Sequence, residues 1–363
     1  MLKLLFLVAY PNIKGPLPKI LPILLGQLDN LGCEIRQAYW SRHSDEESIL
    51  GKILGRLHDI WHIRKELQVG TVDMMVITTT HDWMAILRDL PLLLVVRTLC
   101  PKIVIHFHGS FSNRLVSPGN GLMKFFTRQI MKRVDAVLLF SNEEIREWSM
   151  FFPAMKYYRV DNPYLSQNNL TETQEAAALG TMDKIPVLFF AGRLVEEKGI
   201  FDLVDALSMI KEKMPFRLVL AGFGPDEKRL KRKIQASNLA DQITFVGYLQ
   251  GEELSRAYQS ADLFVFPSWR EGFPLVLVEA MDFGLPIVTT CIRGAADRLV
   301  ERENTLFVNP RQPKELARAI ENLATDQILC QKMRANNLKK AKEYAPDVVG
   351  KKYYDILRAV VYQ

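Results

Sequence analysis

The sequence predicts an α/β protein of two Rossmann-like domains, each a doubly wound parallel sheet with helices on both faces. Short apolar runs alternate with longer amphipathic runs along the whole chain. With 363 residues, the chain is long enough for two domains with separate cores. A polar segment, residues 166–184, divides the halves as a linker. Ligand sites are expected at the carboxyl ends of the strands, where the two domains face a cleft.

The apolar runs define the expected strands and, through them, the domains. The expected strands of the first half are Leu2–Val8, Glu34–Ala38, Asp73–Thr78, Lys102–Phe107 and Asp135–Phe140. Those of the second half are Val187–Phe190, Arg217–Ala221, Ile243–Val246, Asp262–Phe266, Pro286–Thr289 and Leu306–Val308. The expected domains are therefore residues 1–165 and 185–349, with a final helix, 350–363, that packs back on the first domain.

Composition and charge narrow the class of protein. Hydrophobic residues make up 48% and charged residues 24%, which is ordinary for a globular protein, and no apolar run approaches the roughly 20 residues of a membrane helix. The four cysteines are scattered without a C-x-x-C pair, which favours reduced thiols and a cytoplasmic location. Residues 1–165 hold 20 Lys and Arg against 15 Asp and Glu, so the first half is expected to meet an anionic partner.

The most informative segment runs from Ser268 to Met281 and follows an expected strand. Gly272 and Phe273 form a turn, and Pro274 suits the first position of a helix that ends before Gly284. Two carboxylates bracket this helix start: Glu271 precedes it, and Glu279 lies inside an otherwise apolar stretch. A lone acid in such a stretch usually has a partner or a function. The free amides of the first turn suit a phosphorylated or polyhydroxylated ligand.

A second segment, Gly192 to Gly199, also follows an expected strand. Arg193 and Lys198 stand five residues apart, and a helix begins at Ile200. Two cations beside a helix N-terminus can cradle a diphosphate. The alternative is a solvated turn in which the neighbouring glutamates neutralise the cations.

Two further strand ends contain glycines. Ala221-Gly222-Phe223-Gly224-Pro225 begins like a dinucleotide-binding motif, but Glu227 replaces the third Gly, so the motif does not indicate NAD. Gly247 and Tyr248 end another strand, where backbone amides could bind the edge of a base, and an ordinary turn is the alternative.

His106 and His108 end a strand of the first half and point to one face. No third ligand is suitably spaced for zinc. His108 is therefore expected to donate a hydrogen bond to a substrate, with a structural histidine as the alternative.

Together these segments resemble the retaining glycosyltransferases of family 4, in the group 1 glycosyl transferases with the GT-B fold. The resemblance rests on EGFPLVLVEAM at 271–281, GRLVEEKG at 192–199, AGFGP at 221–225, FVGYL at 245–249 and HFHG at 106–109. Their order and spacing match over nearly all of the chain.

The resemblance implies a role for each site residue. Arg193 and Lys198 would bind the donor diphosphate, and Glu279 would bind the ribose. Glu271, with the amides of Gly272, Phe273 and Leu275 beside Pro274, would hold the sugar that is transferred. Gly247 and Tyr248 would frame the base, and His108 would contact the sugar. The catalytic residues would be Glu271, His108, Arg193 and Lys198.

The resemblance also implies the reaction. A sugar passes from a nucleotide-sugar, most commonly a UDP-sugar, to an acceptor with retention, which gives an α-linked product. The chain has no D-x-D motif for a metal ion. No metal and no cofactor are expected, because cations and helix amides can stabilise the leaving diphosphate. One departure concerns the loop after the first strand, where the family often has two glycines. Only Gly15 is present here.

The acceptor is expected to be a glycan or a lipid-linked molecule in cell-surface polysaccharide, lipopolysaccharide or glycolipid synthesis. Residues 49–67 carry an apolar stripe, and Lys124, Arg128 and Lys132 form a basic line beside Phe125 and Phe126. These patterns favour a peripheral position on the anionic inner face of the plasma membrane. Core-packed helices with solvated outer faces are the alternative.

Two other classes of protein compete with the transferase. An NAD-dependent oxidoreductase is opposed by the broken glycine motif. A non-enzymatic polyanion-binding protein is suggested by the pI near 9.0. The chain contains no recognised nucleic-acid-binding motif, so no nucleic-acid partner is expected.

Overall fold

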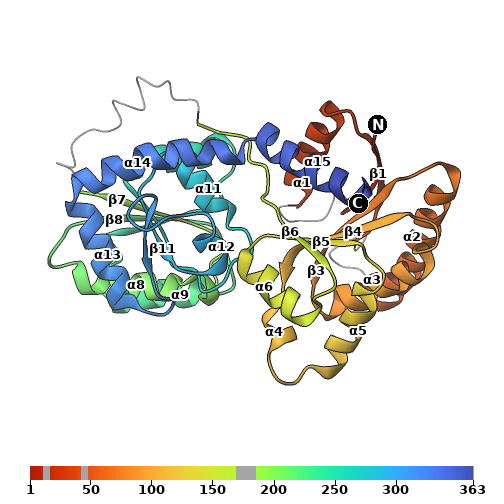
Figure 1. The fold of residues 1–363 in the computed structure, drawn as a ribbon. Coiled ribbons are helices and arrows are strands. Elements are labelled where there is room, and N and C mark those ends of the chain that lie inside the picture. Colours follow the sequence, from red (N-terminus) through yellow and green to blue (C-terminus); the bar gives the residue numbers. More distant parts are fainter. Residues whose placement is uncertain (11–16, 42–47, 169–184, 363) are drawn as a thin grey trace. The chain divides into compact units, whose positions relative to one another are not determined.

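The computed structural model describes residues 1–10, 17–41, 48–168 and 185–362. The chain forms two compact units, one of Met1–Tyr164 with Pro346–Gln363 and the other of Leu165–Ala345 (Figure 1). Each unit contains one six-stranded sheet, and neighbouring strands pair in parallel. Parallel strands require crossover connections, and helices supply them here. The predicted α/β class with doubly wound parallel sheets is confirmed.

The N-terminal sheet has the strand order β2-β1-β3-β4-β5-β6. Its strands are β1 (Lys3–Val8), β2 (Glu34–Tyr39), β3 (Met74–His81), β4 (Lys102–Ser110), β5 (Ala136–Leu139) and β6 (Lys156–Arg159). The sequence predicted the first five and missed β6. This strand lies at the sheet edge with both ends exposed and reads Lys-Tyr-Tyr-Arg, so it lacks the apolar run that marks a buried strand.

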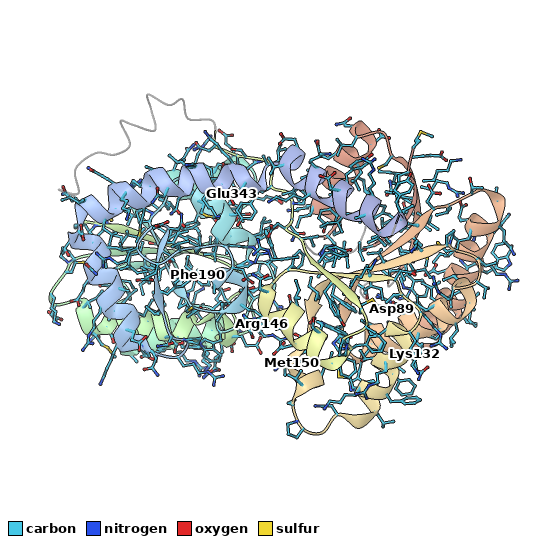
Figure 2. All side chains as sticks on the ribbon, viewed as in Figure 1. Asp89, Lys132, Arg146, Met150, Phe190 and Glu343 are labelled. Carbon is cyan, nitrogen blue, oxygen red and sulfur yellow. The ribbon has the colours of Figure 1, made fainter. Side chains whose placement is uncertain are left out.

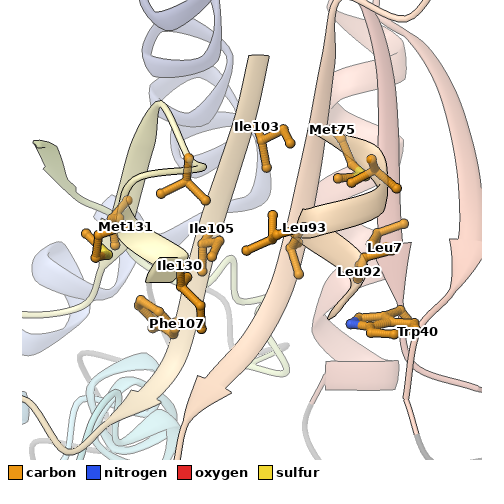
Figure 3. Close-up of a cluster of buried hydrophobic side chains, with 14 of the residues drawn as sticks. Leu7, Trp40, Met75, Leu92, Leu93, Ile103, Ile105, Phe107, Ile130 and Met131 are labelled. Atoms are coloured by element: carbon orange, nitrogen blue, oxygen red, sulfur yellow. The ribbon is translucent and has the colours of Figure 1, made fainter. Parts of the chain in front are cut away.

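Helices cover both faces of the N-terminal sheet. They are α1 (Leu17–Asn30), α2 (Ile49–Val69), α3 (Trp83–Val96), α4 (Asn113–Val116), α5 (Gly121–Met131), α6 (Asn142–Phe151) and α15 (Pro346–Tyr362). One face packs its odd-numbered strand residues, such as Leu7, Met75 and Ile105, against α2, α3, α5 and α6 (Figure 3). On the other face, α15 packs beside α1, and the Tyr353 hydroxyl lies 3.0 Å from His106 Nδ1.

The C-terminal sheet has the order β12-β11-β10-β7-β8-β9. Its strands are β7 (Val187–Ala191), β8 (Arg217–Ala221), β9 (Ile243–Gly247), β10 (Leu263–Phe266), β11 (Ile287–Thr290) and β12 (Thr305–Val308). Each was predicted from its apolar run. Strands β8 and β9 lie on one side of β7, and β10, β11 and β12 lie on the other side. The strand order therefore reverses between β7 and β10, which is where open parallel sheets bind ligands.

The C-terminal helices complete the second unit. They are α8 (Ile200–Ile210), α9 (Glu227–Ala236), α10 (Glu252–Gln259), α11 (Leu275–Asp282), α12 (Arg293–Ala296), α13 (Pro313–Thr325) and α14 (Gln327–Ala341), with short turns η1 (Glu196–Lys198) and η2 (Lys342–Tyr344). Helix α8 packs against α13 and α9, and α11 packs against α14. Pro274 is the N-cap of α11 rather than its first residue, because its ψ of 90° is extended. Gly284, with φ +65°, follows the end of α11 as expected.

The start of the expected linker is anchored to the C-terminal unit. Ser166 Oγ donates a 2.7 Å hydrogen bond to Asp282 Oδ1, and the Gln167 amide donates to Asp282 Oδ2 at 2.9 Å. Residues 169–184 of the linker lie outside the described residues. Among the described helices, none combines the length and apolarity that a bilayer crossing needs.

Candidate active site

Two loops meet where the C-terminal sheet reverses its strand order. One follows β7 and spans residues 192–199, and the other follows β10 and spans residues 267–274. The Trp269 amide donates a 2.8 Å hydrogen bond to the Glu197 carbonyl. Gly199 has φ +69°, and a Cβ there would lie 2.0 Å from the Pro267 carbonyl oxygen. Only glycine therefore allows the two loops to approach this closely.

The two loops bring together Lys198 and Glu271, which the sequence placed in separate motifs. Lys198 Nζ forms an ion pair with Glu271 Oε1. Ser268 Oγ donates to the same oxygen at 2.7 Å. The Lys198 and Glu271 side chains are 23% and 12% exposed, so the pair is largely shielded but open to a ligand. Ser268 was missed, although its position three residues before Glu271 was the available signal.

Arg193 lies on the same loop as Lys198 but faces solvent. Its side chain is exposed and has no hydrogen-bond or ion-pair partner within the described ranges. Gly192 lies beside it, and a Cβ there would meet the rings of Phe190 and Phe266 at 3.4 and 3.5 Å. The site thus offers one paired cation and one cation available to bind an anion.

The glycines after β8 have a structural role that explains the broken dinucleotide motif. A Cβ on Gly222 would lie 1.9 Å from the Gly192 carbonyl oxygen, and a Cβ on Gly224 would lie 2.2 Å from the Leu194 carbonyl oxygen. The Gly222 amide also donates to the Gly247 carbonyl at 2.6 Å. These glycines let the loops after β7, β8 and β9 pack backbone against backbone, with no need for a third glycine.

Gly247 is the last residue of β9 and Tyr248 follows it, so the strand ends at the predicted glycine, and an aromatic residue lies beside Tyr248. Gly247 has φ +71°, and a Cβ there would have no neighbouring atom within 4 Å among the described residues. The Tyr248 and Phe223 rings are both exposed and meet edge to face, with centroids 5.8 Å apart. Exposed rings of this kind can pack against a planar base. Phe223 was not among the predicted site residues, because only the glycines on either side of it belong to a recognisable motif.

The start of α11 carries the predicted turn. Gly272 and Phe273 precede the N-cap Pro274, and Leu275 is the first helical residue. The Arg298 guanidinium lies over the Phe273 ring, 4.1 Å from its centroid, and packs against the turn. The Leu277 amide donates a 3.0 Å hydrogen bond to the Pro274 carbonyl. The Leu275 and Val276 amides precede the first intrahelical hydrogen bond, so they are suitable donors to an anionic or hydroxylated ligand.

Glu279 lies one turn into α11 and has the partner that its apolar surroundings predicted. The Tyr258 hydroxyl donates a 2.7 Å hydrogen bond to Glu279 Oε2. Tyr258 is buried on α10 and stacks on Phe283 at 5.4 Å. This hydrogen bond fixes one carboxylate oxygen. Tyr258 was missed because it lies 21 residues away in the sequence.

Two predicted site residues belong to the N-terminal half. His108 lies near the end of β4, where its ring contacts those of His106 and Phe140 at 3.9 and 5.3 Å. Its Nε2 is buried without a hydrogen-bond partner in the part of the chain that the structure describes. Burial lowers the pKa of His108 to about 3, so the imidazole is neutral at pH 7. Gly15 lies outside the described residues.

Within residues 1–10, 17–41, 48–168 and 185–362, no three His, Cys, Asp or Glu side chains are grouped closely enough to hold an ion.

The sequence is similar to those of sugar-transferring enzymes. Residues 172–340 match the family model of the glycosyl transferases group 1. An uncharacterised glycosyltransferase of Methanocaldococcus jannaschii is 30% identical over 172 residues, which is 47% of this chain and 44% of that protein. An α-D-kanosaminyltransferase of Streptomyces kanamyceticus is 25% identical over 288 residues, covering 74% of this chain and 73% of that protein.

A third relative comes from Campylobacter jejuni and is an N,N'-diacetylbacillosaminyl-diphospho-undecaprenol α-1,3-N-acetylgalactosaminyltransferase. It is 26% identical over 180 residues, which is 50% of this chain and 46% of that protein. The matches to the Methanocaldococcus and Campylobacter proteins thus span about half the length of those relatives.

Solved structures share the fold over the whole chain. Anabaena HepE in complex with UDP and glucose superimposes with a TM-score of 0.73 and 16% identity, covering 99% of this chain and 100% of that one. Two parallel six-stranded sheets of this kind define the GT-B fold. The similar sequences are those of glycosyltransferases. Residues 172–340 thus resemble the glycosyl transferases group 1.

Proposed function

We propose that the enzyme transfers a sugar from a UDP-sugar to a glycan or lipid-linked acceptor, with retention of configuration and an α-linked product. The observation that carries this proposal is the Lys198–Glu271 ion pair at the point where the C-terminal sheet reverses its order. A cation for a diphosphate and a carboxylate for sugar hydroxyls meet there beside free helix amides. The similarity to a structure that holds UDP and glucose supports this donor.

The donor diphosphate is proposed to bind Arg193, Lys198 and the N-terminal amides of α11. The Arg193 side chain is exposed and has no partner among the described residues, so it can turn to the phosphates without breaking a contact there. Lys198 already lies at the loop junction, where a phosphate would replace or share its contact with Glu271. Negative charge grows on the leaving diphosphate as the sugar bond breaks, and fixed positive groups there lower the barrier.

The rest of the donor is proposed to follow the same edge of the sheet. The Glu279 carboxylate, which Tyr258 orients, accepts a hydrogen bond from a ribose hydroxyl. The base lies beside Gly247 and Tyr248, and we add Phe223 to this part of the site because its ring meets that of Tyr248. Glu271 and the amides of Gly272, Phe273 and Leu275 hold the sugar. Neutral His108, whose buried Nε2 has no partner in the described residues, is proposed to hydrogen-bond the sugar.

The reaction is proposed to need no metal ion and no cofactor, because Arg193, Lys198 and the helix amides supply the positive charge that a metal would otherwise supply. The acceptor is proposed to belong to cell-surface polysaccharide or glycolipid synthesis on the cytoplasmic side of the membrane. The relative whose name includes a diphospho-undecaprenol acceptor supports a lipid-linked molecule.

Donor screening tests the proposal. The purified enzyme is titrated with UDP, GDP, ADP and NAD while its thermal unfolding is recorded, and UDP-sugars are then assayed for transfer, with the linkage of the product determined. UDP should stabilise the protein, and transfer should persist in EDTA. Glu271→Ala and Lys198→Ala should each remain folded and lose turnover by about two orders of magnitude or more. Stabilisation by NAD alone, or a β-linked product, would contradict the proposal.

A further inference from the structure

The outer face of α3 is apolar, which is unusual for a helix on the surface of a unit. Trp83, Met84, Leu87 and Leu94 are all exposed, and Met84 is 69% exposed. The helix contains only two charged residues, and both turn inward. Asp89 is buried and accepts from Trp40 Nε1 at 2.8 Å, and the Arg88 guanidinium lies over the Trp40 ring at 5.7 Å. A surface helix normally presents polar side chains outward.

The apolar surface continues from α3 onto α5. The Trp83 ring meets that of Phe126 at 6.3 Å, and Phe126 meets Phe125 at 5.4 Å. Phe125 is 54% exposed and Leu122 69% exposed on the outer side of α5. Helices α3 and α5 pack side by side (Figure 1). We call Trp83, Met84, Leu87, Leu122 and Phe125 the α3–α5 face. Contiguous exposed apolar residues of this kind mark an interaction surface.

The segment that forms the α5 side of this face has one sign of charge. Residues 111–134 contain five basic residues and no Asp or Glu, and the basic residues are Arg114, Lys124, Arg128, Lys132 and Arg133. Lys132, labelled in Figure 2, is exposed at the end of α5. Arg128 and Lys132 stand three and seven residues after Phe125, so cations flank the apolar side chains along the helix. An apolar face with a basic border is complementary to a surface that is apolar below and anionic above.

An anionic lipid bilayer has this chemistry, and other occupants fit less well. A second copy of the chain would bring the five cations of one protomer against those of the other if the two faces met symmetrically. A nucleic acid would complement the charge but not the exposed Met84, Leu87 and Leu122. The fourteen residues of α3 make a helix about 21 Å long, shorter than the roughly 30 Å hydrocarbon core, so docking would be parallel to the membrane surface.

We propose that the α3–α5 face docks the enzyme on an anionic membrane surface, with its apolar side chains among the acyl chains and the cations of residues 111–134 at the headgroups. The proposal rests on the proposed transfer to a lipid-linked acceptor, which the docked enzyme would meet at the interface. Helix α2 has a similar outer side, since Leu54, Leu57 and Trp61 are exposed and Lys65 Nζ lies 5.5 Å from the Trp61 ring. The sequence pointed to α2 and α5, whereas α3 emerges only from the structure.

Vesicle sedimentation of the full-length enzyme tests this proposal. The wild type should sediment with vesicles of phosphatidylcholine containing about one third phosphatidylglycerol, and much less with pure phosphatidylcholine or in high salt. Met84→Glu/Leu87→Glu should weaken the partitioning by about tenfold or more, since two apolar side chains are withdrawn from lipid. Lys132→Glu should weaken binding to the anionic vesicles alone, by roughly fivefold or more.

Matched controls lie on the C-terminal unit. Ile328 on α14 is 82% exposed, and Ile328→Glu adds a charge at an exposed apolar residue outside the α3–α5 face. Lys332→Glu reverses an exposed charge on the same helix. Both variants should sediment like the wild type. Wild-type binding that is absent, or equal losses in the control variants, would overturn the proposal. So would a dimer in solution that Met84→Glu/Leu87→Glu dissociates, since a second copy would then cover the face.

UDP titration of the same samples separates the two proposals. If the α3–α5 face only docks lipid, all four variants should bind UDP as the wild type does. A wild-type enzyme that binds UDP but does not sediment with the anionic vesicles would refute membrane docking and leave the donor assignment in place. An enzyme that binds vesicles but not UDP would refute the proposed donor instead.

Discussion

Trp269 and Asp202 join the loop after β10 to helix α8. The Trp269 Nε1–H donates a 2.6 Å hydrogen bond to Asp202 Oδ2, and the Arg311 guanidinium lies 4.2 Å above the Trp269 ring. Trp269 stands two residues before Glu271, and its amide is bonded to the loop that carries Lys198. This contact positions both halves of the ion pair.

Trp269→Phe should therefore impair catalysis without unfolding the protein. The variant keeps a ring beneath Arg311 and loses only the hydrogen bond, so stability should fall by about 1 kcal/mol. The ratio kcat/KM should fall by about tenfold, because a loosened loop mispositions Glu271. Asp202→Asn should weaken the same contact. Asp205→Asn, one turn further along α8, removes a charge paired with Lys233 and should leave kinetics unchanged. Equal kinetic effects at Asp202 and Asp205 would reject the positioning role.

Removing the charge of Lys198 and removing that of Arg193 should have different effects on stability. Lys198→Met leaves Glu271 without its ion-pair partner, so both stability and turnover should fall. Arg193→Gln removes an exposed side chain and should leave the thermal midpoint within about 1 °C, while donor affinity falls by about tenfold. Calorimetric titration with UDP and thermal unfolding of both variants give the comparison. A drop in midpoint for Arg193→Gln as large as that for Lys198→Met would contradict the assignment.

Tyr258 should affect nucleotide binding through Glu279. Tyr258→Phe keeps the stack on Phe283 and removes the hydroxyl that orients the Glu279 carboxylate. UDP affinity should fall by roughly fivefold, about 1 kcal/mol, as for loss of one hydrogen bond. Glu279→Gln should lower the affinity for UDP by a larger factor. The double variant should bind UDP only slightly more weakly than Glu279→Gln alone. Effects that simply add in the double variant would indicate that Tyr258 does not act through Glu279.

Gly222 and Gly247 offer a comparison between crowding and backbone strain. Both have positive φ, but a Cβ on Gly222 would lie 1.9 Å from the Gly192 carbonyl oxygen, whereas nothing lies within 4 Å at Gly247. Gly247→Ala should lower the free energy of unfolding by about 1 kcal/mol from the left-handed backbone alone. Gly222→Ala should cost about 3 kcal/mol or more, because it also pushes two loops apart. Urea unfolding measures both, and similar losses would argue against the tight loop packing.

Acid should destabilise the N-terminal unit through its buried histidines. Burial lowers the pKa of His81 to about 4, and His81 Nδ1 has no partner in the described part of the chain. The unfolded state therefore binds the proton more readily, so stability is highest above pH 6.5 and falls as the pH drops toward 4. His81 alone should account for about 3 kcal/mol over this range.

Urea unfolding at several pH values checks this histidine effect. His81→Gln should flatten the dependence on pH between 6.5 and 4, since one titrating group is removed. A variant with the full wild-type slope would show that His81 does not titrate in this window.

The sequence by itself determined all but one of the strands and marked the residues of the proposed donor site. Buried parallel strands are continuous apolar runs, so every strand of the C-terminal sheet could be predicted from the sequence. The half-exposed edge strand β6 has no such run and could not. Glycines, cations and carboxylates at strand ends marked residues 192–199 and 271–279 as candidate site segments. Their charges and backbone preferences are local properties that do not depend on the tertiary structure.

Only the tertiary structure decided which of these groups meet. The pairing of Lys198 with Glu271 and of Tyr258 with Glu279 depends on strand order, since β7 and β10 are neighbours in space but not along the chain. The sequence likewise did not show which side of α3 faces solvent. A helix that is apolar nearly all round has no periodic pattern to show which side meets the core, and only packing against the sheet selects it.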